Sequence, residues 1–308
     1  MKYIKKFNTY TEYNTFKNSI NYLIPNVSLI KEASTVDFSL PPTPPPIMAG
    51  DIVYWDNGTI KTTQLKWWKS SIGTPIGVVV IPEEFAPDGK IRIVSLNPAD
   101  SNGNQSDSHV SLPWSSNGTD TSLPNYTMVP TTDNVGSTST GSNGNGYLPS
   151  DNLTGTQSFV DALAKYNGSS FLIPSPYLGS EPNTEYYKEL SDGNALSDFN
   201  GMANTQTLIA LNKGNETANA CWNYSDGISN LQWYLPAMGE LGYLMPRFKL
   251  INESISAVGG VIIPVGNAFW SSTENSSLST YFLNTGNGNV TYGRKSDYRH
   301  YRPFTILN

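Results

Sequence analysis

Few residues of this chain are of the types that carry out chemistry, and they are far apart in the sequence. The 308 residues include one cysteine, Cys221, and two histidines, His109 and His300. Cys221 stands beside Trp222 in a helix-patterned segment, which favours a buried small apolar side chain over a nucleophile. Two distant histidines predict neither a metal cluster nor a catalytic triad.

The acidic residues are scattered and do not form a recognisable pair. Glu83 and Glu84 fall in a predicted turn, whereas a glycosidase needs two carboxylates that face each other across the substrate. We therefore predict no catalytic residue, no metal site and no cofactor, and we expect that the protein is not an enzyme.

The composition favours a β-rich protein with many ordered turns. Charged residues make up 14% of the chain, and 19 Lys and Arg against 25 Asp and Glu give a net charge of 19 − 25 = −6. A nucleic-acid partner is not expected without a basic patch. The start MKYIKKF is followed by polar residues, so we expect no signal peptide, no lipobox and no membrane insertion.

Residues 1–47 predict an extended N-terminal arm rather than a domain with its own core. A short amphipathic helix at 9–19 and strand-like segments at 26–30 and 36–40 precede PPTPPP, a stiff polyproline spacer over 41–46. A floppy terminus is the alternative. We favour an arm that becomes ordered on a partner or in an oligomer.

The next segments predict strands and an ordered loop. A hairpin is expected at 52–63, around Asp56-Asn57-Gly58, and 75–82 should form a buried central strand because both alternating faces are apolar. The Ser/Asn/Gly-rich excursion 97–150 is long for a loop, so we expect it to be mostly ordered and to pack on the domain or on a neighbouring subunit. Trp67 and Trp68 are expected to pack in the core or between elements.

The C-terminal half predicts helices followed by a sheet. Helices are expected at 157–166, 205–211 and 216–224, and an amphipathic helix at 237–258 should be interrupted at Pro246 and stopped by Gly259-Gly260. Strands then follow near 268–273, 279–285, 289–294 and 298–306.

The order of motifs WYLPAMGEL (233–241), FWSSTE (269–274) and YRPF (301–304) resembles C-type-lectin-like domains of the DUF1566 kind. More narrowly, it is similar to variants encoded by gut Bacteroidales, their phages and diversity-generating retroelements. The resemblance is good over 190–308 and looser back to residue 50. The arm resembles the start of structural proteins of Bacteroidales (crAss-like) phages. The fold implied is α+β: a C-type-lectin-like domain over 48–308 with a long ordered loop insertion, preceded by the extended arm.

The resemblance also implies roles for residues. A rigid base would comprise Trp233, Leu235, Pro236, Glu240, Trp270, Ser271, Ser272, Arg302 and Pro303. A ligand-binding display face would comprise Asn275, Asn284, Asn289, Thr291, Arg294, Asp297, Tyr298 and Arg299. Tyr, Asn and Arg suit recognition because they combine stacking area with adaptable hydrogen bonds. Ordinary polar strand faces without a ligand are the alternative.

Two departures limit what the resemblance implies. Calcium-dependent lectins use an EPN-type loop followed by a WND-type strand, but Glu181-Pro182-Asn183 here precedes the predicted helices and no such strand follows. Calcium needs six to eight converging oxygens, so sugar binding through calcium is not expected. Formylglycine-generating enzymes share the fold class but need cysteine chemistry that a lone Cys221 does not supply.

Together these features predict a phage virion structural protein, a head-fibre or tail-fibre or decoration subunit on the virion surface that is assembled in the host cytoplasm. Its arm would bind capsid or tail proteins, it would form a homotrimer, and its lectin-like head would bind a glycan or protein on the host surface for attachment. Many copies would multiply weak single-site binding. A secreted or surface adhesin of a Bacteroidales bacterium is the alternative, and an enzyme of the formylglycine-generating type is third.

Overall fold

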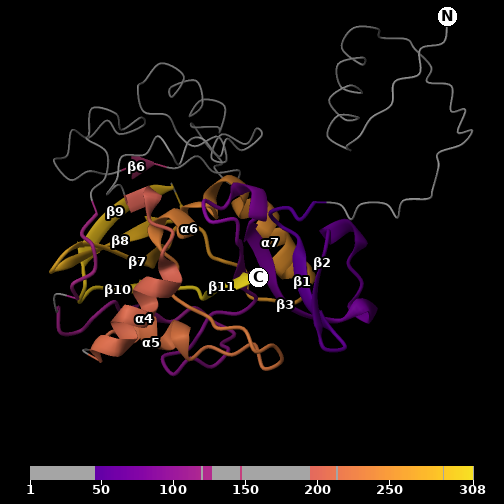
Figure 1. The fold of residues 1–308 in the computed structure, drawn as a ribbon, viewed down its shortest axis with the longest axis horizontal. Coiled ribbons are helices and arrows are strands. Elements are labelled where there is room, and N and C mark those ends of the chain that lie inside the picture. The colour runs from indigo at the N-terminus through magenta and orange to yellow at the C-terminus, as the bar shows by residue number, and fades with distance from the viewer. Residues whose placement is uncertain are drawn as a thin grey trace, which may run out of the picture. The chain divides into compact units, whose positions relative to one another are not determined.

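The computed structural model describes residues 46–118, 121–126, 146–147, 195–212, 214–286 and 288–307 (Figure 1). These residues belong to one compact unit of the chain, Pro46–Asn308. The predicted N-terminal arm, except for residues 46 and 47, lies outside them, as do the predicted helix at 157–166 and the tripeptide Glu181-Pro182-Asn183.

Residues 52–95 and the C-terminal strand form an antiparallel sheet with the order β11-β4-β3-β1-β2. Its strands are β1 (Ile52–Asp56), β2 (Thr59–Thr63), β3 (Thr74–Ile81), β4 (Ile91–Ser95) and β11 (Phe304–Leu307). Asn57 (φ 47°) and Gly58 (φ 93°) make the predicted hairpin turn, in which both central residues need positive φ. β3 is central and buried, as its apolar run predicts.

The second sheet has the order β5-β10-β7-β8-β9-β6. Its strands are β5 (Ser111–Pro113), β6 (Gly146–Tyr147), β7 (Ala268–Ser276), β8 (Ser279–Asn284), β9 (Asn289–Arg294) and β10 (Tyr298–His300). β10 runs parallel to β7, and the other pairs are antiparallel. Two strands from the predicted excursion, β5 and β6, therefore complete a sheet built by the C-terminal residues.

The described residues include the α-helices α4 (Gly201–Leu211), α5 (Glu216–Trp222), α6 (Met238–Gly242) and α7 (Phe248–Ala257). Short 3-10 helices cover Leu65–Trp67, Ser70–Ile72, Glu83–Phe85, Ala195–Ser197 and Met245–Arg247. The last of these contains Pro246 and divides the predicted 237–258 helix, as expected from the missing proline N–H. Gly259, at φ 78°, follows the end of α7 as predicted. The fold class is α+β, with two largely antiparallel sheets.

Two apolar clusters form the core. Val78 and Val80 of β3 enter the first cluster with α6, α7 and the apolar residues of β8 and β9. Val79 enters the second with Trp114, Cys221 of α5 and Trp270 of β7. Because successive strand residues point to opposite faces, β3 contributes to both clusters. Figure 1 shows α7 lying over the first sheet, where it contacts β3, and α4 beside β7.

The excursion is ordered where the structure describes it. Trp114 is buried and its indole N–H donates to Ser271 O at 2.8 Å. Trp67, however, is 53% exposed, so the expectation that it packs in the core is wrong. It lies in a one-turn 3-10 helix, and the side chain of Lys66 lies over its ring.

The predicted strand over 298–306 is two strands that belong to different sheets. β10 ends at His300, the chain crosses over at Tyr301, Arg302 and Pro303, and β11 begins at Phe304. Proline has no N–H for a sheet ladder, which fits a break at this point. The Arg302-Pro303 motif therefore joins the two sheets.

Arg302 is fully buried and holds this crossing in place. Its guanidinium donates to Ser95 O at 2.9 Å, to Leu96 O and to Val261 O at 2.8 Å. Burial lowers the pKa of Arg302 to about 9, so it remains charged at neutral pH. Carbonyl dipoles at the end of β4 and after α7 thus solvate a buried cation.

Among the described residues, no helix combines the length and the apolar character that crossing a lipid bilayer requires.

We predict that Arg302→Ala lowers the free energy of unfolding by about 3–5 kcal/mol, because three buried carbonyls lose their donor at about 1–3 kcal/mol each and water relieves part of the loss. Urea denaturation followed by tryptophan fluorescence measures this. Arg294→Ala, at an exposed position, should change the same quantity by less than about 0.5 kcal/mol. Equal midpoints for the two variants would show that Arg302 does not hold the sheets together.

Candidate functional site

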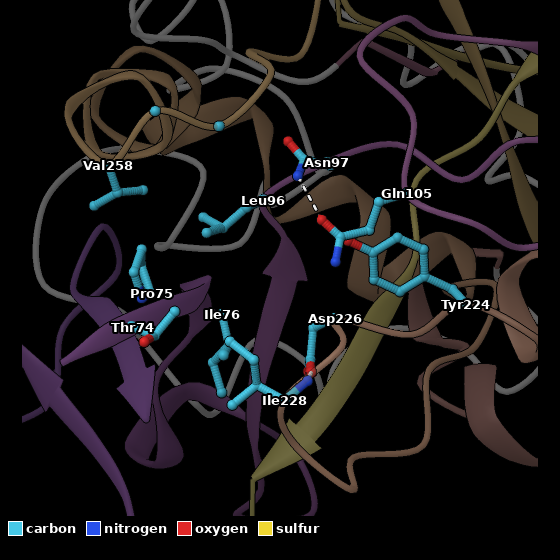
Figure 2. Close-up of a pocket in the computed structure, with 12 residues that line it drawn as sticks. Thr74, Pro75, Ile76, Leu96, Asn97, Gln105, Tyr224, Asp226, Ile228 and Val258 are labelled. Atoms are coloured by element: carbon cyan, nitrogen blue, oxygen red, sulfur yellow. Dashed lines mark hydrogen bonds between the residues drawn. The ribbon is translucent and has the colours of Figure 1, made fainter. Parts of the chain in front are cut away.

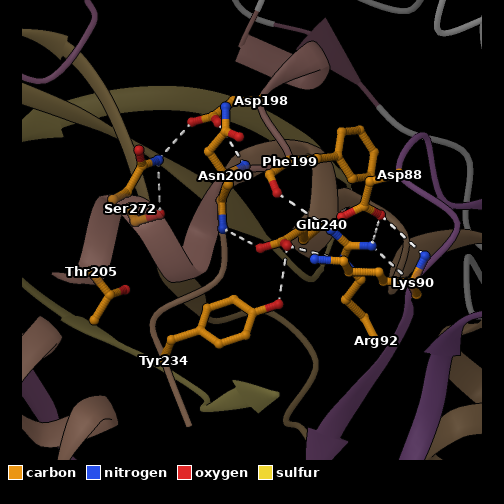
Figure 3. Close-up of polar contacts among 12 residues, drawn as sticks. Asp88, Lys90, Arg92, Asp198, Phe199, Asn200, Thr205, Tyr234, Glu240 and Ser272 are labelled. Carbon is orange, nitrogen blue, oxygen red and sulfur yellow. Dashed lines mark hydrogen bonds and ion pairs between the residues drawn. The ribbon is translucent and has the colours of Figure 1, made fainter. Parts of the chain in front are cut away.

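The motif WYLPAMGEL forms a buried polar junction around Glu240. The Glu240 carboxylate accepts hydrogen bonds from Ala237 N at 2.9 Å, Tyr234 Oη at 3.0 Å and Arg92 Nε at 3.1 Å (Figure 3). A β-carbon at Gly201, the first residue of α4, would collide with this carboxylate. Glu240 thereby connects α6, β4 and the start of α4.

Burial sets the electrostatics of this junction. Glu240 is 0% exposed, and burial raises its pKa to about 7 even though Arg92 and the Ala237 N–H act in the opposite direction. Burial opposes the charge of Arg92 as well, but Asp88, Glu240 and Tyr234 raise its pKa overall. The Arg92 guanidinium also reaches Asp88 at the surface, with Nη2 to Oδ2 at 2.8 Å.

A second junction surrounds Asp198 and fixes the FWSSTE strand. The Asp198 carboxylate accepts from Asn204 Nδ2 at 2.9 Å and from Thr273 Oγ1 at 2.8 Å. Asn204 Nδ2 also donates to Ser272 Oγ at 3.3 Å, as Figure 3 shows. Burial raises the pKa of Asp198. All nine residues of the predicted base are buried: Trp233, Leu235, Pro236, Glu240, Trp270, Ser271, Ser272, Arg302 and Pro303.

A third buried polar contact is the ion pair between Lys295 and Glu274. Lys295 Nζ lies 2.5 Å from Glu274 Oε1, and both side chains are 0% exposed. Thr121 donates to the other oxygen of Glu274, and the Lys295 ammonium lies 4.9 Å from the centre of the Trp114 ring. This pair connects the end of β9 to β7 and to the excursion.

Arg299 forms a stack with two aromatic residues on one face of the second sheet. In the register of the sheet, Trp270 lies opposite Phe282 and Phe282 opposite Thr291. The Arg299 guanidinium carbon lies 3.7 Å from the centre of the Phe282 ring and 4.9 Å from that of Trp270. We call Trp270, Phe282, Thr291 and Arg299 the arginine stack.

The arginine stack has an unused hydrogen-bonding group. Arg299 Nη2 donates to Asp297 Oδ2 at 3.2 Å, and the Arg299 side chain is 22% exposed. Arg299 Nε is buried and has no hydrogen-bond partner. Burial lowers the pKa of Arg299, and Asp297 partly offsets this. A buried N–H without an acceptor costs about 1–3 kcal/mol.

The structure brings only part of the predicted display face together. Asn284 and Thr291 share the face of Arg299, and Asn289 pairs with Asn284 in the register. Asp297 joins them through its ion pair with Arg299. Thr291 itself belongs to the arginine stack, and Asn284 and Asp297 lie on its side of the sheet.

The other predicted display residues lie elsewhere. Tyr298 is 70% exposed, but it precedes Arg299 in β10 and therefore points to the opposite face. Arg294 is exposed at the end of β9, where the Asp297 N–H closes a turn onto its carbonyl. Asn275 donates to Tyr126 O and Tyr281 Oη, at 3.2 and 3.0 Å, so internal contacts occupy its amide.

Phe282 contacts Arg299 but was not among the residues predicted from the sequence to form the site. Its neighbours Tyr281 and Leu283 point into the first core cluster, while Phe282 lies on the other face, where it is 8% exposed. The alternation in TYFLN could have indicated that Phe282 lies on the face opposite to Tyr281 and Leu283. Because all three of these residues are apolar, however, the pattern does not separate the two faces.

The two histidines are neighbours in the folded chain. His109 and His300 are far apart in the sequence, but their ring centres are 5.7 Å apart. Burial, with Arg302 nearby, lowers the pKa of His109 to about 4. Cys221 is buried, and burial raises its pKa. Within the described residues, no group of three or more His, Cys, Asp or Glu is placed to hold a metal ion.

A comparison with protein families found no matching family, and a comparison with curated proteins found no match. Among solved structures, the chain is similar to a fimbrial protein from Bacteroides ovatus ATCC 8483, with a TM-score of 0.44 and 16% sequence identity. The alignment covers 84% of this chain and 49% of the fimbrial protein. The chain thus spans about half the length of that protein.

We predict that the stability contributed by Glu240 falls as pH rises. The pKa of Glu240 is about 7 in the folded state, whereas an unperturbed glutamate has a pKa of 4.5. The folded protein therefore binds this proton more tightly than the unfolded chain does. The unfolding free energy therefore decreases from about pH 5 to pH 8, by up to about 3 kcal/mol from this group.

Urea denaturation at several pH values tests this with two variants. The difference in unfolding free energy between wild type and Glu240→Gln should decrease over that pH range. Glu253→Gln, at an exposed position on α7, should differ from wild type by the same amount at every pH. A pH-independent difference for Glu240→Gln would contradict the prediction.

Proposed function

We propose that this protein is a recognition subunit of a phage virion, a head-fibre, tail-fibre or decoration protein whose C-type-lectin-like head binds a glycan or protein on the host surface. The observation that carries the binding role is the arginine stack. The Arg299 guanidinium carbon lies 3.7 Å from the centre of the Phe282 ring, and the Arg299 side chain is 22% exposed. The virion assignment is supported by the sequence resemblance of the arm and of residues 190–308.

The physical chemistry of the arginine stack supports recognition. An arginine held against an aromatic ring loses little side-chain freedom on binding, and it offers fixed donors to a carboxylate, carbonyl or hydroxyl oxygen. Asn284 and Thr291 on the same face add amide and hydroxyl groups with adaptable hydrogen bonding. Two buried carboxylates bond to neighbouring residues of β7, which also carries Trp270: Asp198 accepts from Thr273, and Glu274 is paired with Lys295.

The particle assignment is tested by immunogold electron microscopy of purified virions with an antibody against residues 190–308. We expect gold on the capsid or on the tail, and its position identifies the fibre. Gold on bacterial cells with none on particles would overturn the virion assignment and favour a bacterial adhesin.

We predict that Arg299→Ala reduces adsorption to host cells about tenfold or more. Loss of one contact worth about 1.4 kcal/mol weakens a single site about tenfold. The effect on the particle can be larger because many copies bind together. Arg299→Lys retains the charge but not the planar stack, so it should recover only part of the adsorption. Adsorption assays with particles that carry each variant measure this.

Lys69→Ala changes another exposed cation on the first-sheet side of the chain and should leave adsorption unchanged. Circular dichroism verifies that every variant is folded. Adsorption of a folded Arg299→Ala variant at the wild-type rate would show that the arginine stack does not bind the host.

A further inference from the structure

A cavity of about 230 Å³ opens beside the first sheet, and it shares no lining residue with the arginine stack. Its walls come from the start of β3, the end of β4, the chain after α5 and the end of α7. Four segments that are distant in the sequence therefore converge on one concave site (Figure 2).

The two sides of the cavity differ in chemistry. Figure 2 shows apolar side chains on one side, among them Pro75, Leu96 and Val258. Asn97, Gln105 and the ring of Tyr224 lie on the other side. Asp226 and Ile228 lie between these two sides, near the middle of the view, and Ile228 is 39% exposed. Such a lining suits a ligand with one C–H face and one polar edge.

The polar side is already ordered by internal hydrogen bonds. Asn97 Nδ2 donates to Gln105 Oε1 at 2.8 Å, and Gln105 Nε2 donates to Ser225 O at 3.2 Å. Asp226 Oδ1 accepts from Ile228 N and Ser229 N at 2.8 and 2.6 Å. Little side-chain freedom would be lost when a ligand binds.

These hydrogen bonds leave capacity for a ligand. A side-chain amide nitrogen carries two hydrogens, and these bonds use one each on Asn97 and Gln105. The second Asp226 oxygen accepts from Ser229 Oγ and has a further lone pair. The cavity therefore offers both N–H donors and a carboxylate acceptor, which is what a hydroxyl group needs because it donates and accepts at once.

Charge and size narrow the ligand class. None of the lining residues is Lys, Arg or His, and Asp226 is acidic, so an anionic ligand would meet repulsion without a counter-charge. A wholly apolar ligand would desolvate Asp226 and the two amides without replacing their hydrogen bonds to water. The volume is below the range of about 300–1,000 Å³ of drug-sized ligand sites, which limits the occupant to about one ring.

We propose that this cavity binds one neutral sugar ring. The C–H face of the ring packs on Pro75, Leu96 and Val258, and its hydroxyls bond to Asn97, Gln105 and Asp226. The site uses side chains alone and no calcium ion. It is separate from the arginine stack and does not rest on the function proposed for it.

Saturation-transfer difference NMR on the full chain tests this proposal with the methyl glycosides of glucose, galactose, mannose, fucose and N-acetylglucosamine as probes. At least one probe should receive saturation, with a millimolar dissociation constant as expected for so small a ligand. Ile228→Trp places a large ring at the exposed edge of the cavity and should reduce the signal at least fivefold. Gln105→Leu removes an amide donor and should reduce it as well.

Two controls separate this site from other surfaces. Ile262→Trp makes the same substitution at another exposed isoleucine, which is 50% exposed, and should retain the signal. Arg299→Ala alters the arginine stack and should also retain it. The proposal is overturned if no probe receives saturation from the wild type, if folded Ile228→Trp binds as the wild type does, or if Arg299→Ala alone abolishes binding.

Discussion

The buried guanidinium of Arg302 is the contact on which the arrangement of the two sheets depends. It lies where the chain leaves β10 and enters β11, and its acceptors are the carbonyls of Ser95, Leu96 and Val261. A buried cation is costly unless its donors are satisfied, so the crossing, the end of β4 and the segment after α7 have to keep their relative positions. The second sheet is thereby fixed against the first.

The same principle organises the interior of the second sheet. Glu240, Asp198 and Glu274 are buried carboxylates in three separate networks, and each accepts hydrogen bonds from elements that are distant in the sequence. Such networks add little net stability compared with apolar packing, but a missing partner is expensive. They restrict the core to one arrangement, and the strands that contribute to it keep their register.

This division between a fixed interior and an adaptable surface is what a recognition protein requires. The arginine stack draws its rigidity from Trp270 and Phe282, and the sugar cavity draws its own from hydrogen bonds between the chain after β4 and the chain after α5. The two sites lie on different elements and differ in charge, since one is built around a cation and the other holds a carboxylate. The two binding proposals therefore do not depend on each other.

The sequence determined the features that depend on neighbouring residues. The Asn57-Gly58 turn, the buried strand β3, the break at Pro246 and the stop at Gly259 all follow from local conformational preferences, and the structure confirms them. The nine residues predicted to form a rigid base, among them Trp233 and Pro303, are buried.

Tertiary structure decided what depends on distant partners. Only packing shows that residues 298–307 form two strands in different sheets and that His109 lies beside His300. Alternation along a strand assigns residues to two faces, but it does not say which face another element covers. For that reason the predicted display face separated into a group around Arg299 and residues such as Tyr298 and Asn275 that lie elsewhere.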